Sequence, residues 1–138
     1  MSTIDGPAGV DAPQVLCDVR AALAEAAAAP TGVVWRMTES GRQLDANLLN
    51  LAAGQVIGTH AEPDLDVLLV VVAGSGTMST DDGPLELGPG RLVWLPHGST
   101  RSLAAGADGL AYLTVHRRRP GMQIRSGPPE HGPYAVSS

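Results

Sequence analysis

Short apolar runs separated by turn residues fill most of the chain after residue 32. Six of these runs predict β-strands, at residues 33–37, 45–51, 67–72, 85–87, 91–95 and 110–116. Turn-forming pairs such as Ser40-Gly41 and Ala105-Gly106 lie between them. Strands at such regular spacing are typical of a β-sandwich or a closed barrel. The pattern therefore predicts an all-β domain.

A helical period precedes the strands. Between residues 13 and 29, apolar side chains recur three or four positions apart, at Leu16, Val19, Leu23 and Ala26. Pro13 suits the first turn of a helix, and Pro30 suits a position just beyond its end. We therefore expect one amphipathic helix over about residues 13–29, packed on the outside of the β-domain.

Glycine, proline and small polar residues dominate both ends of the chain. Residues 1–12 and 127–138 show no hydrophobic periodicity, so we expect a flexible leader and a mobile tail. Residues 13–126 are expected to form a single domain, with the β-structure at about 33–119. One domain also fits a length of 138 residues.

Composition limits the partners and the location that we expect. Hydrophobic residues make up 43% of the chain and phenylalanine is absent, so aliphatic side chains must fill the core, which favours strands. The net charge of −5 repels phosphate backbones and anionic lipids, so neither nucleic acid nor membrane partners are expected. A single cysteine, Cys17, and the lack of a secretory pattern favour a cytoplasmic location.

Two segments carry glycine, histidine and proline at defined spacings. The first is GQVIGTHAEPDLDVLLVVVAGSG at residues 54–76, in which His60 follows Gly54 after five residues. The second is GRLVWLPHGSTR at residues 90–101, which contains Gly90, Pro96 and Gly98. Together they resemble the paired motifs of the cupin superfamily. The resemblance implies a cupin-type β-barrel, that is a jelly roll or double-stranded β-helix, with one N-terminal α-helix.

The chain departs from the cupin pattern at the positions that hold a divalent metal in the family. Glu62 stands at the second histidine of the first motif, and Arg101 replaces the histidine of the second. The glutamate position falls on Asp66 or on Val67, depending on where a gap is placed. Because arginine has no lone pair to give, no cofactor is expected. If a divalent metal is bound, its ligands would be His60, Glu62 and Asp66.

The motif residues also suggest a ligand site inside the barrel. Alternation along a strand places His60 and Glu62 on one face, and Arg101 opens the facing segment. A buried carboxylate needs a partner, so a Glu62–Arg101 ion pair is predicted. We expect His60, Glu62, Arg101 and Asp66 to bind a small polar or anionic molecule.

Two other functions remain open from the sequence. One is a metal-dependent cupin enzyme, an isomerase, lyase or oxygenase, that uses His60 and Glu62. The other is a structural or interaction module whose barrel is filled by side chains, for which the apolar run 67–72 is an argument. The resemblance further implies a homodimer, with the helix or an edge strand as candidate contacts.

Several polar residues receive plainer interpretations. Pro63 and Asp64 mark a loop, so Asp66 is better explained as a solvated or turn-capping acid than as a ligand. His97 is expected on the surface. His116 and the run 117–119 of three arginines are interpreted as a solvated basic corner or as dimer salt bridges, in preference to an anion-binding site.

Overall fold

The computed structural model describes residues 12–27 and 31–119. Within these residues one helix precedes seven strands: α1 (Val19–Ala26), β1 (Gly32–Arg36), β2 (Leu44–Leu51), β3 (Val56–Ala61), β4 (Val67–Thr80), β5 (Gly83–Leu87), β6 (Leu92–Leu95) and β7 (Thr100–Arg117). All strand pairings are antiparallel. The all-β prediction with one N-terminal helix is confirmed.

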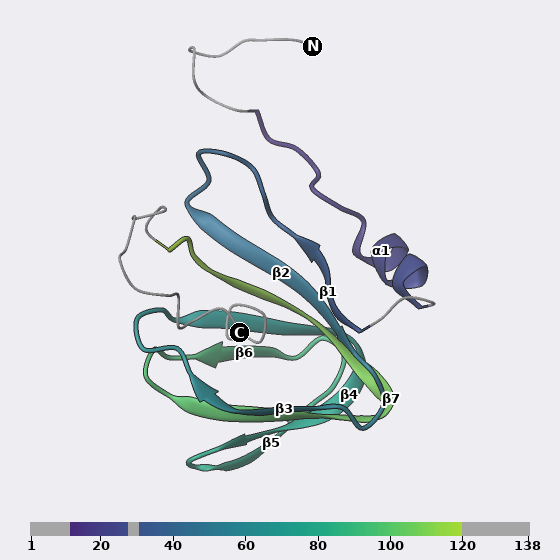
Figure 1. The fold of residues 1–138 in the computed structure, drawn as a ribbon, viewed down its shortest axis with the longest axis vertical. Coiled ribbons are helices and arrows are strands. Elements are labelled where there is room, and N and C mark those ends of the chain that lie inside the picture. The colour runs from purple at the N-terminus through teal and green to yellow at the C-terminus, as the bar shows by residue number, and fades with distance from the viewer. Residues whose placement is uncertain (1–11, 28–30, 120–138) are drawn as a thin grey trace, which may run out of the picture.

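Two long strands, β4 and β7, run through the whole barrel (Figure 1). They pair with each other from Val67 opposite His116 to Thr80 opposite Arg101. The first half of β4 also pairs with β6, and its second half pairs with β5. In the same way, one half of β7 pairs with β2 and the other with β3. Each long strand therefore contributes to both layers of the barrel.

The long strands bend where their register shifts. Irregularities interrupt the β4–β7 pairing near residues 71–76. Gly74 lies there with a φ of +76°, and a Cβ added to it would sit 2.2 Å from the carbonyl oxygen of Gly109. Such a conformation and such a close approach require glycine. The bend lies at one end of the barrel, and both termini of β4 and of β7 lie at the other end, which we call the polar end.

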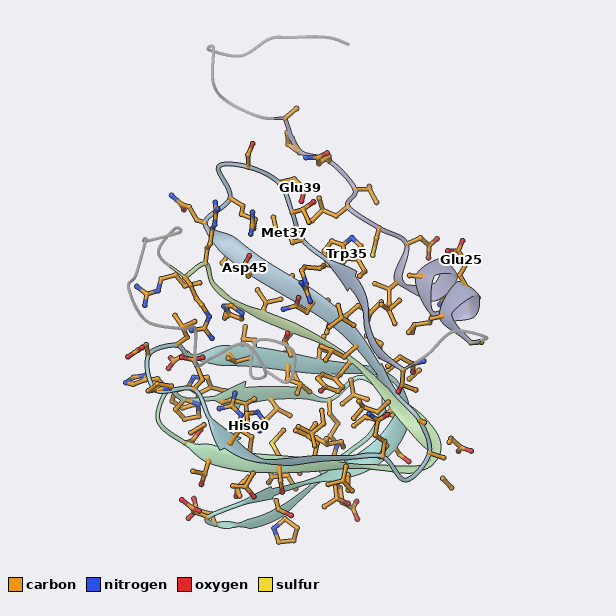
Figure 2. All side chains as sticks on the ribbon, in the orientation of Figure 1. Glu25, Trp35, Met37, Glu39, Asp45 and His60 are labelled. Carbon is orange, nitrogen blue, oxygen red and sulfur yellow. The ribbon has the colours of Figure 1, made fainter. Side chains whose placement is uncertain are left out.

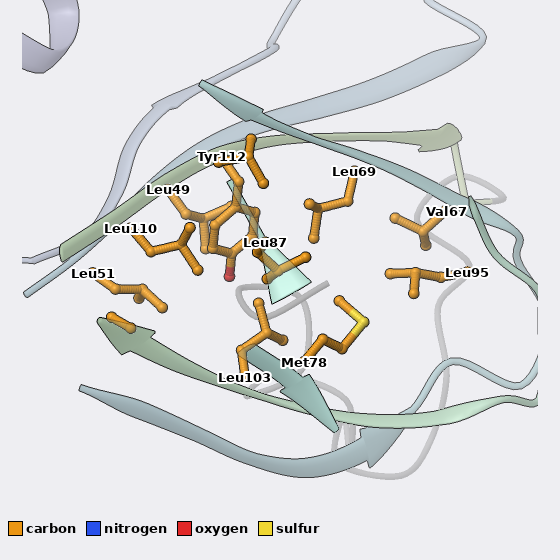
Figure 3. Packing of buried hydrophobic residues seen from close by; sticks show 12 residues of the cluster. Leu49, Leu51, Val67, Leu69, Met78, Leu87, Leu95, Leu103, Leu110 and Tyr112 are labelled. Atoms are coloured by element: carbon orange, nitrogen blue, oxygen red, sulfur yellow. The ribbon is translucent and has the colours of Figure 1, made fainter. Parts of the chain in front are cut away.

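The core fills the space between the two layers (Figure 3). Alternate residues of the strands face inward and are buried, as period-two alternation requires. The cluster includes Leu49, Leu51, Val67, Leu69, Val71, Met78, Leu87, Leu95, Leu103, Ala105, Leu110 and Tyr112. Aliphatic side chains dominate it, as the composition predicts.

The helix is shorter than predicted at its N-terminal side. Residues 13–18 are not helical, and α1 begins at Val19. Asp18 caps it: its backbone is extended and its side chain accepts a hydrogen bond from the N–H of Ala21 at 3.1 Å. A capping aspartate competes with helix extension because its side chain takes the place of a helical backbone partner. Val15, upstream of the cap, is 89% exposed.

The strand prediction places six strands correctly but underestimates two of their lengths and misses β3. Each of the six predicted runs overlaps a strand, but β4 and β7 extend over 14 and 18 residues. The pair Ala105-Gly106, predicted as a turn, lies inside β7, and β3 was not among the six runs. Small and polar residues hide these extensions from a hydrophobic pattern. The predicted leader 1–12, except for residue 12, and the whole predicted tail 127–138 lie outside the described residues.

No helix in the described part of the chain is long and apolar enough to cross a membrane.

Candidate functional site

The barrel interior changes from apolar to polar with distance from the bend. On β7, the inward residues beside the bend are Ala105 and Leu110, both buried. Toward the two ends of the same strand, inward positions are taken by Arg101 on one side and by Thr114 and His116 on the other. The end of β3 lies opposite the start of β7. Polar side chains of both layers therefore meet at the end away from the bend, the polar end of the barrel.

Arg101 is a buried guanidinium with unused donors. It is 1% exposed, and its one hydrogen bond runs from Nη1 to the carbonyl oxygen of Ser99 at 3.4 Å. Nε and Nη2 are buried and have no partner within the described residues. Burial lowers the pKa of Arg101, and the nearby charge of Glu62 acts in the opposite direction. A buried donor without a partner destabilises the fold.

His60 lies directly across from Arg101 in the β3–β7 pairing. Its Nδ1 is 2.8 Å from the carbonyl oxygen of Gly58. Because a carbonyl only accepts, Nδ1 carries the proton, and a neutral His60 ring leaves Nε2 as an acceptor. Nε2 is buried and has no partner among the described residues. The predicted inward orientation of His60 agrees with this placement.

Two further polar atoms share the interior. The hydroxyl oxygens of Tyr112 and Thr114 are buried and unpartnered in the described chain. Burial raises the pKa of Tyr112 well above its usual value, although the charge of Arg101 opposes the shift. Tyr112 therefore stays a neutral phenol at ordinary pH and remains a hydrogen-bond donor. Figure 3 shows its hydroxyl among leucine side chains.

Glu62 pairs with Arg119 instead of Arg101. The carboxylate is 5% exposed, Oε1 accepts a hydrogen bond from Nη2 of Arg119, and Oε2 accepts one from the N–H of Asp64 at 3.1 Å. Burial alone would raise the pKa of Glu62, but these bonds and the charges of Arg119 and His116 lower it overall. The predicted Glu62–Arg101 ion pair is wrong, because the carboxylate of Glu62 is paired with Arg119, just beyond β7.

Asp66 lies outside the barrel, and Val67 takes the inward position. Val67 is fully buried in the core. Asp66 accepts hydrogen bonds from the N–H of His97 at 2.8 Å, from Nδ1 of His97 at 2.7 Å and from Nε1 of Trp94 at 3.3 Å. These bonds, chiefly those from His97, lower the pKa of Asp66 to about 2. The turn-capping interpretation of Asp66 and the surface position of His97 are confirmed.

The residues at the family's metal positions do not fit a metal. In the structure these positions are His60, Glu62, Val67 and Arg101. Valine offers no donor and arginine has no lone pair to give. Within residues 12–27 and 31–119, no three His, Cys, Asp or Glu side chains gather as a ligand set. The conditional set His60, Glu62 and Asp66 is therefore not brought together.

Sequence reasoning missed three interior residues on β7. Tyr112 and Thr114 are fully buried, and His116 is 8% exposed with Nδ1 2.8 Å from the carbonyl oxygen of Arg117. The interpretation of His116 as part of a solvated corner is wrong. Alternation from Leu110 places these residues on the inward face, so the sequence did contain the pattern. The interpretation failed because His116 was grouped with the three arginines that follow it, which are usually exposed to solvent.

No family model and no curated protein matches the chain. Solved structures do match it. A cupin-2 domain containing protein from Shewanella frigidimarina is 14% identical with a TM-score of 0.59, over 75% of this chain and 95% of that one. A cupin protein from Bacteroides fragilis is 15% identical with a TM-score of 0.55, and the match covers 67% of this chain and 83% of that one. Bacillus subtilis oxalate decarboxylase, described with Mn(II) centers, is 21% identical with a TM-score of 0.51. That match covers 56% of this chain and 22% of the decarboxylase.

Proposed function

We propose, from the premise that this chain has the cupin fold of those neighbours, that it binds a small organic anion at the polar end of its barrel. The observation that carries the proposal is that Arg101 is buried with hydrogen-bond donors that have no partner among the described residues. Its free donors, Nε and Nη2, are the two that project side by side from a guanidinium. That fork matches the two oxygens of a carboxylate or the oxygens of a phosphate.

Energetics favours a functional role for Arg101. A buried cation that lacks a hydrogen-bonded counterion costs several kcal/mol of desolvation. Glu62, the nearby carboxylate, bonds to Arg119 instead. The fold therefore gains little from Arg101, whereas a bound anion would satisfy its donors and gain affinity from them.

Neighbouring atoms narrow the chemistry of the ligand. The acceptor Nε2 of His60 lies across the strand pair from Arg101, and Tyr112 and Thr114 add hydroxyl groups. An anion that also carries a hydroxyl group would donate to His60 while its charge engages Arg101. Apolar side chains fill the rest of the interior. We therefore favour small hydroxycarboxylates or phosphate monoesters.

Replacing Arg101 tests this proposal. Thermal unfolding is measured in the presence of lactate, propionate or glycerol phosphate. Propionate is lactate without the hydroxyl group. Wild-type protein should show a concentration-dependent rise in Tm, larger for lactate than for propionate. Arg101→Met should lose that rise while keeping its stability, or gaining about 1–3 kcal/mol.

Arg91→Met is the matched control, because Arg91, directly before β6, is exposed whereas Arg101 is buried. It should respond as the wild type does. An Arg101→Met protein that is stabilised by the same anions to the same extent would remove Arg101 from the site. No response of the wild type to any of them would instead favour a barrel filled by its own side chains.

The metal-dependent enzyme is the second candidate, and the free Nε2 of His60 is the observation that speaks for it. Elemental analysis of untagged protein, with His60→Ala for comparison, separates the two. We expect metal well below one ion per chain in both proteins. Near-stoichiometric metal that disappears in His60→Ala would support the enzyme.

A further inference from the structure

A pocket rich in arginine lies at the start of β2 and the end of β7, outside the core. Its volume is about 720 Å³, and it is lined by Arg42, Gln43, Leu44, Arg117, Arg118 and Arg119. Figure 2 shows several nitrogen-tipped side chains at this end of β2, where Asp45 is labelled. Four guanidinium groups thus line one surface hollow, in a protein whose net charge is −5.

Hydrogen bonds to backbone carbonyls and to the carboxylate of Asp45 hold two of these arginines in place. Arg42 donates from Nη1 to the carbonyl oxygen of Glu39 at 2.9 Å and from Nε to Asp45 at 2.8 Å. The backbone N–H of Arg118 donates to Gln43 at 2.8 Å, and its Nη1 lies 3.4 Å from the carbonyl oxygen of Arg42. The β2–β7 pairing thus joins the two arginine-bearing segments. A ligand would meet donors that are already oriented.

The pocket carries excess positive charge. Within the described residues, the carboxylates that form salt bridges with its arginines are Asp45, on Arg42, and Glu62, on Arg119. Arg117 and Arg118 form no salt bridge in that part of the chain. Four positive groups against two negative ones leave an excess of two. Like charges held together repel one another, and a dianion would remove that repulsion.

We propose that this arginine pocket is a second anion site, separate from Arg101, that binds a phosphate-bearing small molecule. A phosphate monoester carries close to two negative charges at neutral pH and accepts hydrogen bonds on several oxygens. Both properties match the excess charge and the donors. A hollow of this size has room for the organic part as well. The overall negative charge argues against a long polyanion such as nucleic acid.

Calorimetric titration at low salt tests the second site. The probe is glucose 6-phosphate, with glucose as its uncharged counterpart. The variant is the double substitution Arg117→Gln and Arg118→Gln, and the control is Arg20→Gln with Arg91→Gln, which removes the same charge from exposed positions elsewhere. We expect at least about tenfold weaker binding in the pocket variant, less than about twofold in the control, and no binding of glucose.

The other results would overturn the proposal. Equal loss in both double variants would mean that total charge, not the pocket, attracts the anion. Loss in Arg101→Met with full binding in the pocket variant would assign the probe to the interior site. A single-stranded oligonucleotide that binds more tightly than the sugar phosphate would make nucleic acid the partner. Absence of binding to the wild type would remove the second site, and it would restrict the interior site to hydroxycarboxylates, which the thermal-unfolding experiment tests separately.

Discussion

Glu62 links the polar end of the barrel to acid stability. Its pKa in the folded protein is lowered, because the bonds from Arg119 and the backbone of Asp64 outweigh the effect of burial. A group with a lowered folded-state pKa stabilises the fold fully above its unfolded-state pKa. That contribution is lost as the pH falls through the folded-state pKa. Protonation of Glu62 should therefore destabilise the fold, and it should do so only at acidic pH.

Replacing Glu62 by glutamine should expose this contribution. At pH 7, Glu62→Gln is expected to lower the free energy of unfolding by about 1–3 kcal/mol, because Arg119 loses a charged partner. Between about pH 5 and 3, the loss of stability should be smaller in the variant than in the wild type. Urea unfolding across that range measures both. Asp64→Asn removes a neighbouring exposed acid as the control. Parallel losses in the wild type and Glu62→Gln would show that Glu62 does not set the acid response.

At the scale of the strand, the bend in β4 depends on Gly74. Its φ of +76° and the position of Gly109 leave no space for a side chain, since an added Cβ would lie 2.2 Å from a backbone oxygen. Backbone atoms of another strand cannot move aside as a flexible side chain can. The bend and the two layers that it joins therefore depend on this glycine.

Gly74→Ala should lower the free energy of unfolding by about 2–4 kcal/mol, from backbone strain together with the steric clash. Gly88→Ala is the matched control, because no heavy atom lies within 4 Å of its added Cβ and its φ is not in the left-handed region. It should change stability by less than about 1 kcal/mol. Denaturant unfolding compares the two. Equal stability of the two variants would mean that the bend tolerates a side chain.

For the whole molecule, the outer face of β4 and β6 is apolar as well as the inner one. Leu68 lies opposite Trp94, and Val70 opposite Leu92. Leu68, Leu92 and Trp94 are 45%, 66% and 62% exposed. Within the described residues β6 pairs with β4 alone, so this face ends at a free strand edge. Contiguous exposed apolar surface of this kind is typical of an interface.

The homodimer implied by the family resemblance stays a prediction, and this face is where we place it. Light scattering after size-exclusion chromatography should give the mass of a dimer for the wild type and of a monomer for Leu92→Glu, which would bury a charge in the interface. Leu85→Glu, on β5 and 44% exposed, should remain a dimer. A wild type that is monomeric at micromolar concentration would refute the placement and the dimer together.

The sequence by itself determined the fold class and the candidate residues. Period-two alternation and turn glycines are local properties, so six of the seven described strands could be located from neighbouring residues alone, although not β3. The paired motifs led to the cupin fold and to His60, Glu62 and Arg101, whose side chains do lie at one end of the barrel. The exposed position of Asp66 was also predictable from the loop with Pro63 and Asp64 that precedes it, but its partners Trp94 and His97 lie 28 and 31 positions away and were not.

Only the tertiary structure decided which groups meet. Glu62 and Arg119 are 57 positions apart, and no local pattern distinguishes Arg119 from Arg101 as the partner. The choice between Asp66 and Val67, the burial of His116 and the arginine pocket likewise depend on how β2, β4 and β7 come together. Pairing over such separations is set by the packing of the whole barrel. The sequence therefore specified the strands and the residue types, and the fold specified their neighbours.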